Sequence, residues 1–69
     1  MQRYLIIIEK ADGNYCAYSP DIPGCVAAGL TPEETEREME EAIKFHLEGL
    51  REDGLPIPMP SARAEWVTV

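Results

Sequence analysis

The sequence has few of the residues from which catalytic and metal sites are built. It contains one histidine and two cysteines among 69 residues. Cys16 and Cys25 lack the CxxC spacing of a zinc or redox site, and His46 has no second histidine with which to share a metal ion. A nucleophile such as Ser19 would have only His46 as its base. We therefore expect no catalytic residue, metal or cofactor, and interpret the cysteines as small buried thiols in a reducing compartment.

Long apolar runs are also missing. Only four strongly apolar residues, Leu5 to Ile8, follow the start of the chain, which is too few for a signal peptide. A membrane-spanning helix needs about 20 consecutive apolar residues. The sequence therefore predicts a cytoplasmic protein that does not contact a membrane.

Positive charge is scarce. The sequence has six Lys and Arg but 13 Asp and Glu, so its net charge is −7. This charge argues against direct nucleic-acid binding, because phosphates are bound by clustered basic residues. Residues 33–53 alone carry nine acidic and three basic side chains. Within them, Glu40 and Lys44 are spaced to pair on a helix, as are Glu33 and Arg37. The remaining carboxylates form either a solvated face or a docking face for a basic protein.

The length of the chain limits the number of domains and the size of the core. A chain of 69 residues makes a single domain, residues 1–69, whose core barely offsets the entropy of ordering it. Without a disulfide or metal, self-association is the expected stabiliser. The sequence thus predicts a homo-oligomer.

The first half of the chain has the pattern of extended segments separated by turns. Tyr4 to Ile8 is apolar on both faces and predicts a central strand. Asp12-Gly13 is a hairpin signal, and Tyr15 to Tyr18 is the returning strand. Ser19-Pro20 ends that strand, because proline cannot donate to a ladder.

A Pro-Gly corner separates the second and third extended segments. Pro23-Gly24 suits the central positions of a type II turn, which needs positive φ at its second central residue. Cys25 to Ala28 then resumes an extended course. Gly29 marks either a bulge or a close approach of another backbone.

The most specific local signal is the start of a helix. Thr31 is a good N-cap, Pro32 suits the first helical position, and Glu34 completes a T-x-x-E capping box. The helix should run to about Glu52 and end at Gly54.

The helical period predicts which side of this helix is buried. At 100° per residue one apolar stripe forms and should lie on the sheet; it comprises Met39, Ile43, His46 and Leu50, flanked by Thr35, Ala42 and Leu47. Phe45 falls about 120° from the centre of that stripe, by the same 3.6-residue period. It stands among Glu38 and Glu41, so we interpret it as a tolerated exposed aromatic or an interface residue.

The end of the chain predicts a connector and a last strand. Residues 55–60 have a proline at every second position and read as a stiff extended connector. Residues 64–69 read as the final strand. The expected fold is α+β with the order β-β-β-α-β: a small mixed sheet, its last strand parallel to the first, with one long helix on one face. The other face and both edges stay uncovered, which again favours an oligomer.

The ordered motifs resemble the HicB-like antitoxin family. The resemblance rests on Tyr15-x-Ala-Tyr-x-Pro-Asp-Ile-Pro-Gly-Cys25, on Gly29-x-Thr31 before a glutamate-rich helix, and on three further pieces, namely Glu40-Glu-Ala-Ile43, His46-Leu-Glu-Gly-Leu50 and Asp53-Gly-Leu-Pro-Ile-Pro58. It spans about residues 15 to 60. The family resemblance implies a partly degraded ribonuclease-H-like domain that oligomerises.

The resemblance also implies a partner. Antitoxins of this kind cover the active surface of a small basic, HicA-like toxin that cleaves mRNA. The expected contact residues are those of the corner and the outer helix side: Asp21, Ile22, Pro23, Gly24, Glu38, Glu41 and Phe45. The sequence has no C-terminal DNA-binding segment like that of longer members, so no direct operator binding is expected. Two alternatives stay open: a solitary oligomeric interaction protein without a toxin, and a residual metal-dependent nuclease using Glu9 or Asp21.

Overall fold

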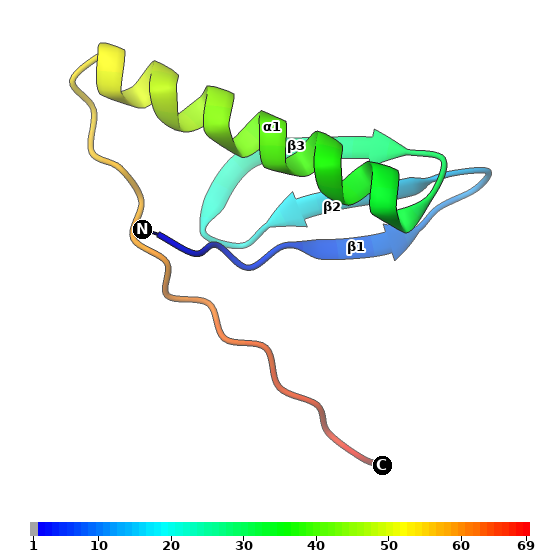
Figure 1. Cartoon of the computed structure of the whole chain (residues 1–69). Coiled ribbons are helices and arrows are strands. Elements are labelled where there is room, and N and C mark those ends of the chain that lie inside the picture. The colour runs from blue at the N-terminus through cyan, green and yellow to red at the C-terminus, as the bar shows by residue number, and fades with distance from the viewer. Residues whose placement is uncertain (1) are drawn as a thin grey trace.

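The computed structural model describes residues 2–69. Three strands, β1 (Ile7–Lys10), β2 (Tyr15–Ser19) and β3 (Ile22–Gly29), precede one helix, α1 (Pro32–Glu52). The strands are antiparallel in the order β1-β2-β3, and α1 lies across one face of the sheet (Figure 1). The predicted α+β class, with one long helix on a small sheet, is confirmed.

The first strand is shorter than predicted and lies at an edge of the sheet. It pairs with β2 from Ile7↔Tyr18 to Lys10↔Tyr15, so β2 is the central strand. Pairing cannot extend back to Leu5 because its partner in this register would be Pro20, which has no N–H to donate. The Ser19 hydroxyl instead donates to the Leu5 carbonyl at 2.8 Å. Residues 2–6 therefore form an irregular flank, and the prediction of a central first strand was wrong.

The reversal between β2 and β3 occurs at Pro20-Asp21 and not at Pro23-Gly24. Ser19 pairs with Ile22, whereas the preceding residue Tyr18 pairs with Val26. Three extra residues on β3 therefore form a bulge opposite the end of β2. Gly24 in this bulge has φ +81°, the value that the second central residue of a type II turn requires. The turn chemistry was predicted correctly, but it bends β3 instead of separating two strands.

The ends of α1 agree with the sequence signals. Thr31 has extended backbone, and its hydroxyl accepts from the Glu34 N–H at 3.1 Å, so it is the predicted N-cap. At the other end Gly54 has φ +69°. The Leu55 N–H donates to the Leu50 carbonyl at 2.8 Å and the Gly54 N–H to the Arg51 carbonyl at 3.1 Å. This is the Schellman pattern, in which a left-handed residue stops the helix.

The core lies between α1 and the sheet. Ile22 and Met39 are fully buried, with Ala17 and Cys25 beside them. On the helix, the predicted stripe faces this core: Thr35, Met39 and Leu47 are buried, and Ala42, Ile43, His46 and Leu50 are half-buried. Cys16 is exposed, so the prediction that both thiols are buried holds only for Cys25. Its strand position explains this, because Cys16 and the buried Ala17 point to opposite faces of β2.

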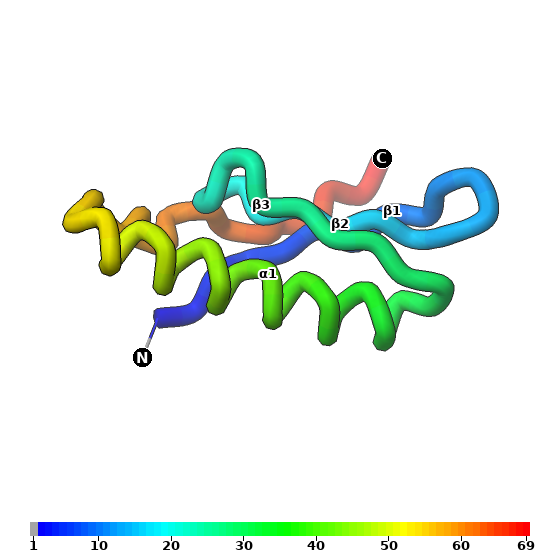
Figure 2. The backbone as a smooth tube through the Cα atoms, turned by 90° about the horizontal axis from the view of Figure 1, so that it is seen from above, coloured from blue at the N-terminus to red at the C-terminus, as the bar shows by residue number. Residues whose placement is uncertain are grey.

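The second face of the sheet is open. In the row Ile8–Ala17–Ala27 the side chains face α1 and pack in or against the core. The neighbouring row is Ile7–Tyr18–Val26, in which Tyr18 is 43% and Val26 67% exposed. Figure 2 shows α1 along one side of the sheet only. The expectation of an uncovered face is thus confirmed for the single chain.

The expected last strand does not form in the single chain. Residues 55–69 contain no helix or strand, so the sheet is wholly antiparallel and not mixed. The connector crosses the N-terminal flank, where the Tyr4 hydroxyl donates to the Pro58 carbonyl. The chain then leaves the molecule on the β1 side (Figure 1), because residues 64–69 meet no strand with which to pair. Within residues 2–69, no helix combines the length and apolarity needed to cross a membrane.

Candidate partner-binding surface

The two flanks of α1 face different parts of the molecule. On one flank an open groove separates the helix from the N-terminal residues, with Tyr4, Ile6, Ile43 and Leu47 among the residues that line it. This flank is therefore on the β1 side. With 3.6 residues per turn, Phe45 projects from the opposite flank. That flank is on the side of β3, the strand on which α1 mainly packs.

The β3 side of the helix carries three of the seven predicted contact residues. Phe45 is 80% exposed, and Glu38 and Glu41 are exposed on the same flank. Pro23 and Gly24 are also exposed, in the β3 bulge, but Figure 2 shows this bend of the chain on the side of the sheet away from α1. We call Phe45, Glu38 and Glu41 the β3-side surface.

Ile22 does not belong to this surface. Its side chain is 0% exposed and packs in the core with Met39. It therefore holds the β2–β3 turn against the helix, and a partner could not reach it without opening the fold.

Asp21 is engaged by the chain's own tail. Its carboxylate accepts from the Ser61 hydroxyl at 3.0 Å and from the Ala62 N–H at 3.1 Å. Partial desolvation acts to raise the pKa of Asp21, but the hydrogen bonds from Ala62 and Ser61 outweigh it and hold that pKa below its usual value. Sequence reasoning took this residue for an exposed corner carboxylate. The structure shows it half-buried and anchoring the C-terminal segment.

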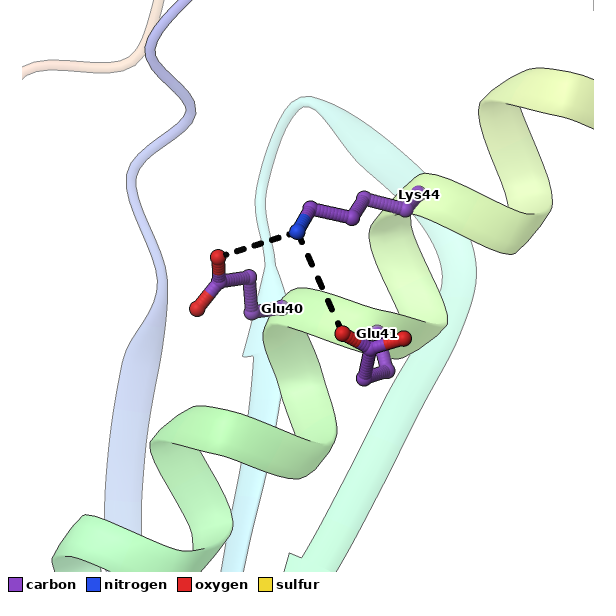
Figure 3. A network of polar contacts seen from close by, with 3 residues as sticks. All are labelled: Glu40, Glu41 and Lys44. Carbon is purple, nitrogen blue, oxygen red and sulfur yellow. Dashed lines mark ion pairs between the residues drawn. The ribbon is translucent and has the colours of Figure 1, made fainter.

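The charge on α1 is only partly neutralised within the chain. Lys44 Nζ lies 3.2 Å from Glu40 Oε1 and 3.9 Å from Glu41 Oε1 (Figure 3). The predicted Glu40–Lys44 pair is thus present, and Lys44 is shared with a second carboxylate. Glu38 forms no ion pair with any residue in 2–69, and the predicted Glu33–Arg37 pair is absent from the same residues. The β3-side surface therefore keeps a local excess of negative charge.

The side chains beside this surface determine whether a catalytic or metal site could form there. His46 is half-buried on the inner side of α1. Across residues 2–69, no three His, Cys, Asp or Glu side chains are grouped so that they could hold a metal ion; Glu9 and Asp21, considered above for a nuclease, are therefore not part of such a group. Burial raises the pKa of the Cys25 thiol, which disfavours the reactive thiolate at neutral pH.

Sequence reasoning missed the groove on the β1 side. Tyr4 and Ile6 had been assigned to a paired strand, in which their contribution to a groove was not visible. The signal that could have revealed it was Pro20, whose missing N–H ends the ladder before these residues.

Comparison with known proteins places the chain in a family. The family described as "HicB_like antitoxin of bacterial toxin-antitoxin system" matches residues 4–68. A 14.9 kDa protein of Haemophilus phage HP1 is 39% identical over 64 residues, which are 93% of this chain and 48% of the phage protein. The chain thus spans about half the length of that relative. A UPF0150 protein of Thermoplasma acidophilum is 37% identical over 68 residues and matches over 97% of this chain and 96% of its own length.

A solved structure shares the fold. A chain of the HicA3 and HicB3 toxin-antitoxin complex superposes with a TM-score of 0.74 and 38% identity, covering 87% of this chain and 70% of that chain. Sequence and fold agree over nearly all of the described residues. The chain therefore belongs to the HicB-like antitoxin family of bacterial toxin-antitoxin systems.

Proposed function

We propose that the chain is an antitoxin that neutralises a small basic, mRNA-cleaving toxin by direct protein–protein contact in the cytoplasm. The observation that carries this proposal is the β3-side surface, where Phe45 is 80% exposed between two carboxylates of an acidic helix. An exposed aromatic with an acidic rim has the composition of a binding hot spot for a basic protein.

The charge of α1 suits the surface of an RNA-cleaving enzyme. Such an enzyme binds phosphates with Lys and Arg, which are repelled by one another and attracted by carboxylates. Nine of the 13 acidic residues lie within residues 33–53, so the protein presents its negative field from one element. Contact with this element would occupy the basic residues that the toxin needs for RNA.

The chain's own part in this function is binding. The proposal gives it no catalytic residue, metal or cofactor and no direct contact with nucleic acid. Pro23 and Gly24 are proposed as a separate contact in the exposed β3 bulge, whereas Asp21 acts indirectly by anchoring the tail. The antitoxin is proposed to work as a homo-oligomer, because its sheet face and edges are uncovered in the single chain.

Charge reversal on the β3 side of α1 tests the surface. The double variant Glu38→Lys, Glu41→Lys should weaken binding to the small basic protein encoded beside this chain about 10- to 100-fold, since close interfacial charge pairs contribute 1.5 kcal/mol or more. The control Asp12→Lys, Asp53→Lys changes the net charge equally, at two exposed positions outside the β3-side surface and the groove. Binding is measured by titration calorimetry, with oligomer size checked in parallel.

Two outcomes would reject the proposal. Equal loss of affinity in the test and control variants would show that net charge and not this surface decides binding. Failure of the unmodified chain to bind any neighbouring basic protein, together with no rescue of toxin-arrested growth, would favour the solitary oligomeric protein instead.

A further inference from the structure

The C-terminal tail, residues 64–69, is exposed although its sequence is that of a strand. Trp66 is 98% and Val67 81% exposed, and these are side chains that folded proteins normally bury. The tail is also part of the family's domain, because the family match extends through residue 68. We therefore expect this segment of the domain to be buried against a binding site.

A site of matching chemistry exists on the same molecule. Among residues 2–69, β1 has β2 on one side and no strand on the other, so one of its edges offers free N–H and C=O groups to a further strand. Beside it lies the groove between the N-terminal flank and α1, to which Tyr4, Ile6 and Leu47 contribute apolar surface and α1 contributes a rim of three glutamates, a lysine and an arginine. A strand added to β1 would place alternate side chains over this groove.

The chain's own tail does not pair with that edge. The Pro58 carbonyl is held by the Tyr4 hydroxyl, and the Ser61 hydroxyl and Ala62 N–H are held by Asp21. These bonds make the connector cross the N-terminal flank before residue 63. The residues beyond it then extend into solvent on the β1 side (Figure 1).

We propose that residues 64–69 of one copy add as a strand to β1 of a second copy and bury Trp66 in that copy's groove. The tail of the second copy binds β1 of the first in the same way, so the two copies form a dimer with two-fold symmetry. This inference deepens the homo-oligomer named in the proposed function. It also supplies the fourth strand of the predicted β-β-β-α-β order from the partner copy.

Charge favours a second copy over a basic protein as the occupant. The only charged side chain within residues 64–69 is Glu65, whose Oε2 lies 2.8 Å from Arg63 Nε. The tail is thus close to neutral, and the charges of the groove nearly balance, because two basic side chains line it beside three carboxylates. A basic protein would instead be attracted to Glu38 and Glu41 on the β3 side. A buried aromatic contributes about 150–250 Å². Two exchanged tryptophans alone bury about 300–500 Å², so the two added strands must supply the rest of the roughly 1,200 Å² of a small stable interface.

The intrinsic fluorescence of the protein tests the exchange directly, because Trp66 is its only tryptophan. Dilution of the full chain from a dimer to a monomer, followed by light scattering, should shift the Trp66 emission to longer wavelength as the indole returns to water. Emission from an exposed indole at every concentration would overturn the proposal. So would a buried indole in a monomer, which would mean that the tail folds onto its own β1.

Substitution separates the tail from other exposed apolar residues. Trp66→Ala should raise the dimer dissociation constant at least 10-fold while leaving the circular dichroism of the monomer unchanged, since the side chain is exposed there. Phe45→Ala is the matched control: it removes an exposed aromatic from the β3-side surface and should leave the dimer intact. A dimer that survives Trp66→Ala, or that Phe45→Ala weakens equally, contradicts the exchange.

Toxin binding distinguishes this inference from the proposed function. A chain that stays monomeric at all concentrations but binds the toxin would reject the exchange and keep the antitoxin role. A chain that dimerises through Trp66 but binds no basic protein would keep the exchange and reject the antitoxin role.

Discussion

Gly29 shows how a single residue sets the distance between the helix and the sheet. A Cβ at this position would lie 2.7 Å from Thr35 Oγ1 and 2.9 Å from Thr35 N, closer than folded proteins allow. Thr35 cannot move away freely, because its hydroxyl donates to the Thr31 carbonyl at 2.7 Å and its side chain is fully buried. The first turn of α1 can therefore pack on β3 only over a glycine.

We expect Gly29→Ala to lower the free energy of unfolding by about 1–3 kcal/mol, the usual cost of forcing an extra group into a packed contact. Gly49→Ala is the control, since a Cβ there meets nothing within 4 Å. Because alanine favours the helix over glycine, Gly49→Ala should instead raise the free energy of unfolding by about 0.5–1 kcal/mol. Urea denaturation followed by circular dichroism measures both. A Gly29→Ala variant as stable as the parent would show that the close approach relaxes at no cost.

Asp21 makes the attachment of the tail sensitive to acid. Its pKa is lowered in the folded state because the ionised carboxylate accepts hydrogen bonds from Ser61 and Ala62. A lowered pKa means that the stabilisation is fully present above the unfolded value, about 3.9 for aspartate. It is lost as the pH falls through the still lower folded value.

Acidification below about pH 4 should therefore release residues 61–62 while the core persists, moving the Ala62 amide resonance in NMR spectra toward its unstructured position. Asp21→Asn should remove this pH dependence. Asp12→Asn changes a carboxylate in the loop at the opposite end of the sheet and should preserve it. An Ala62 shift that titrates identically in all three proteins would exclude Asp21 as the anchor.

At the scale of elements, α1 is defined by its two ends. Thr31 caps the first turn through its hydroxyl, and the left-handed Gly54 completes a hydrogen-bonded stop at the other end. Between them the helix carries like charges at exposed positions, which weaken an isolated helix. The caps and the contact with the sheet must offset that repulsion.

Thr31→Ala should therefore cost about 0.5–2 kcal/mol of stability, because it leaves the Glu34 N–H without its side-chain acceptor. Thr31→Ser keeps the hydroxyl and should stay within a few tenths of a kcal/mol of the parent. Thermal unfolding at constant protein concentration compares the two. If serine and alanine were equally destabilising, the effect would come from the lost methyl group and not from the cap.

At the scale of the whole molecule, two exposed surfaces flank α1. Phe45 and Glu38 lie on the β3 side of the helix, while the groove, lined by Tyr4 and Ile6 and by three glutamates of α1, lies on the β1 side. Under our proposals the first surface binds a basic toxin and the second accepts the tail of another copy. Because the two surfaces lie on opposite flanks of α1, both contacts can be made at once.

Much of this arrangement could be predicted from the sequence because it depends on neighbours in the chain. The N-cap at Thr31, the end of the helix at Gly54 and the positive φ of Gly24 all follow from local backbone chemistry. The buried stripe follows from the helical period, and so does the exposure of Phe45. These features were confirmed.

The remaining features depended on which segments meet. Local sequence patterns do not show whether Ile22 is a contact or a core residue, whether Asp21 is free or engaged, or which strand is central. Each of these depends on a strand register or on a contact between residues far apart in the chain. Residues 64–69 show the difference best: their sequence determines that they favour an extended strand, but only the tertiary structure decides whether a strand lies within reach. In the single chain the bonds at Pro58 and Asp21 fix the connector, and residues 64–69 beyond it pair with no strand among residues 2–69.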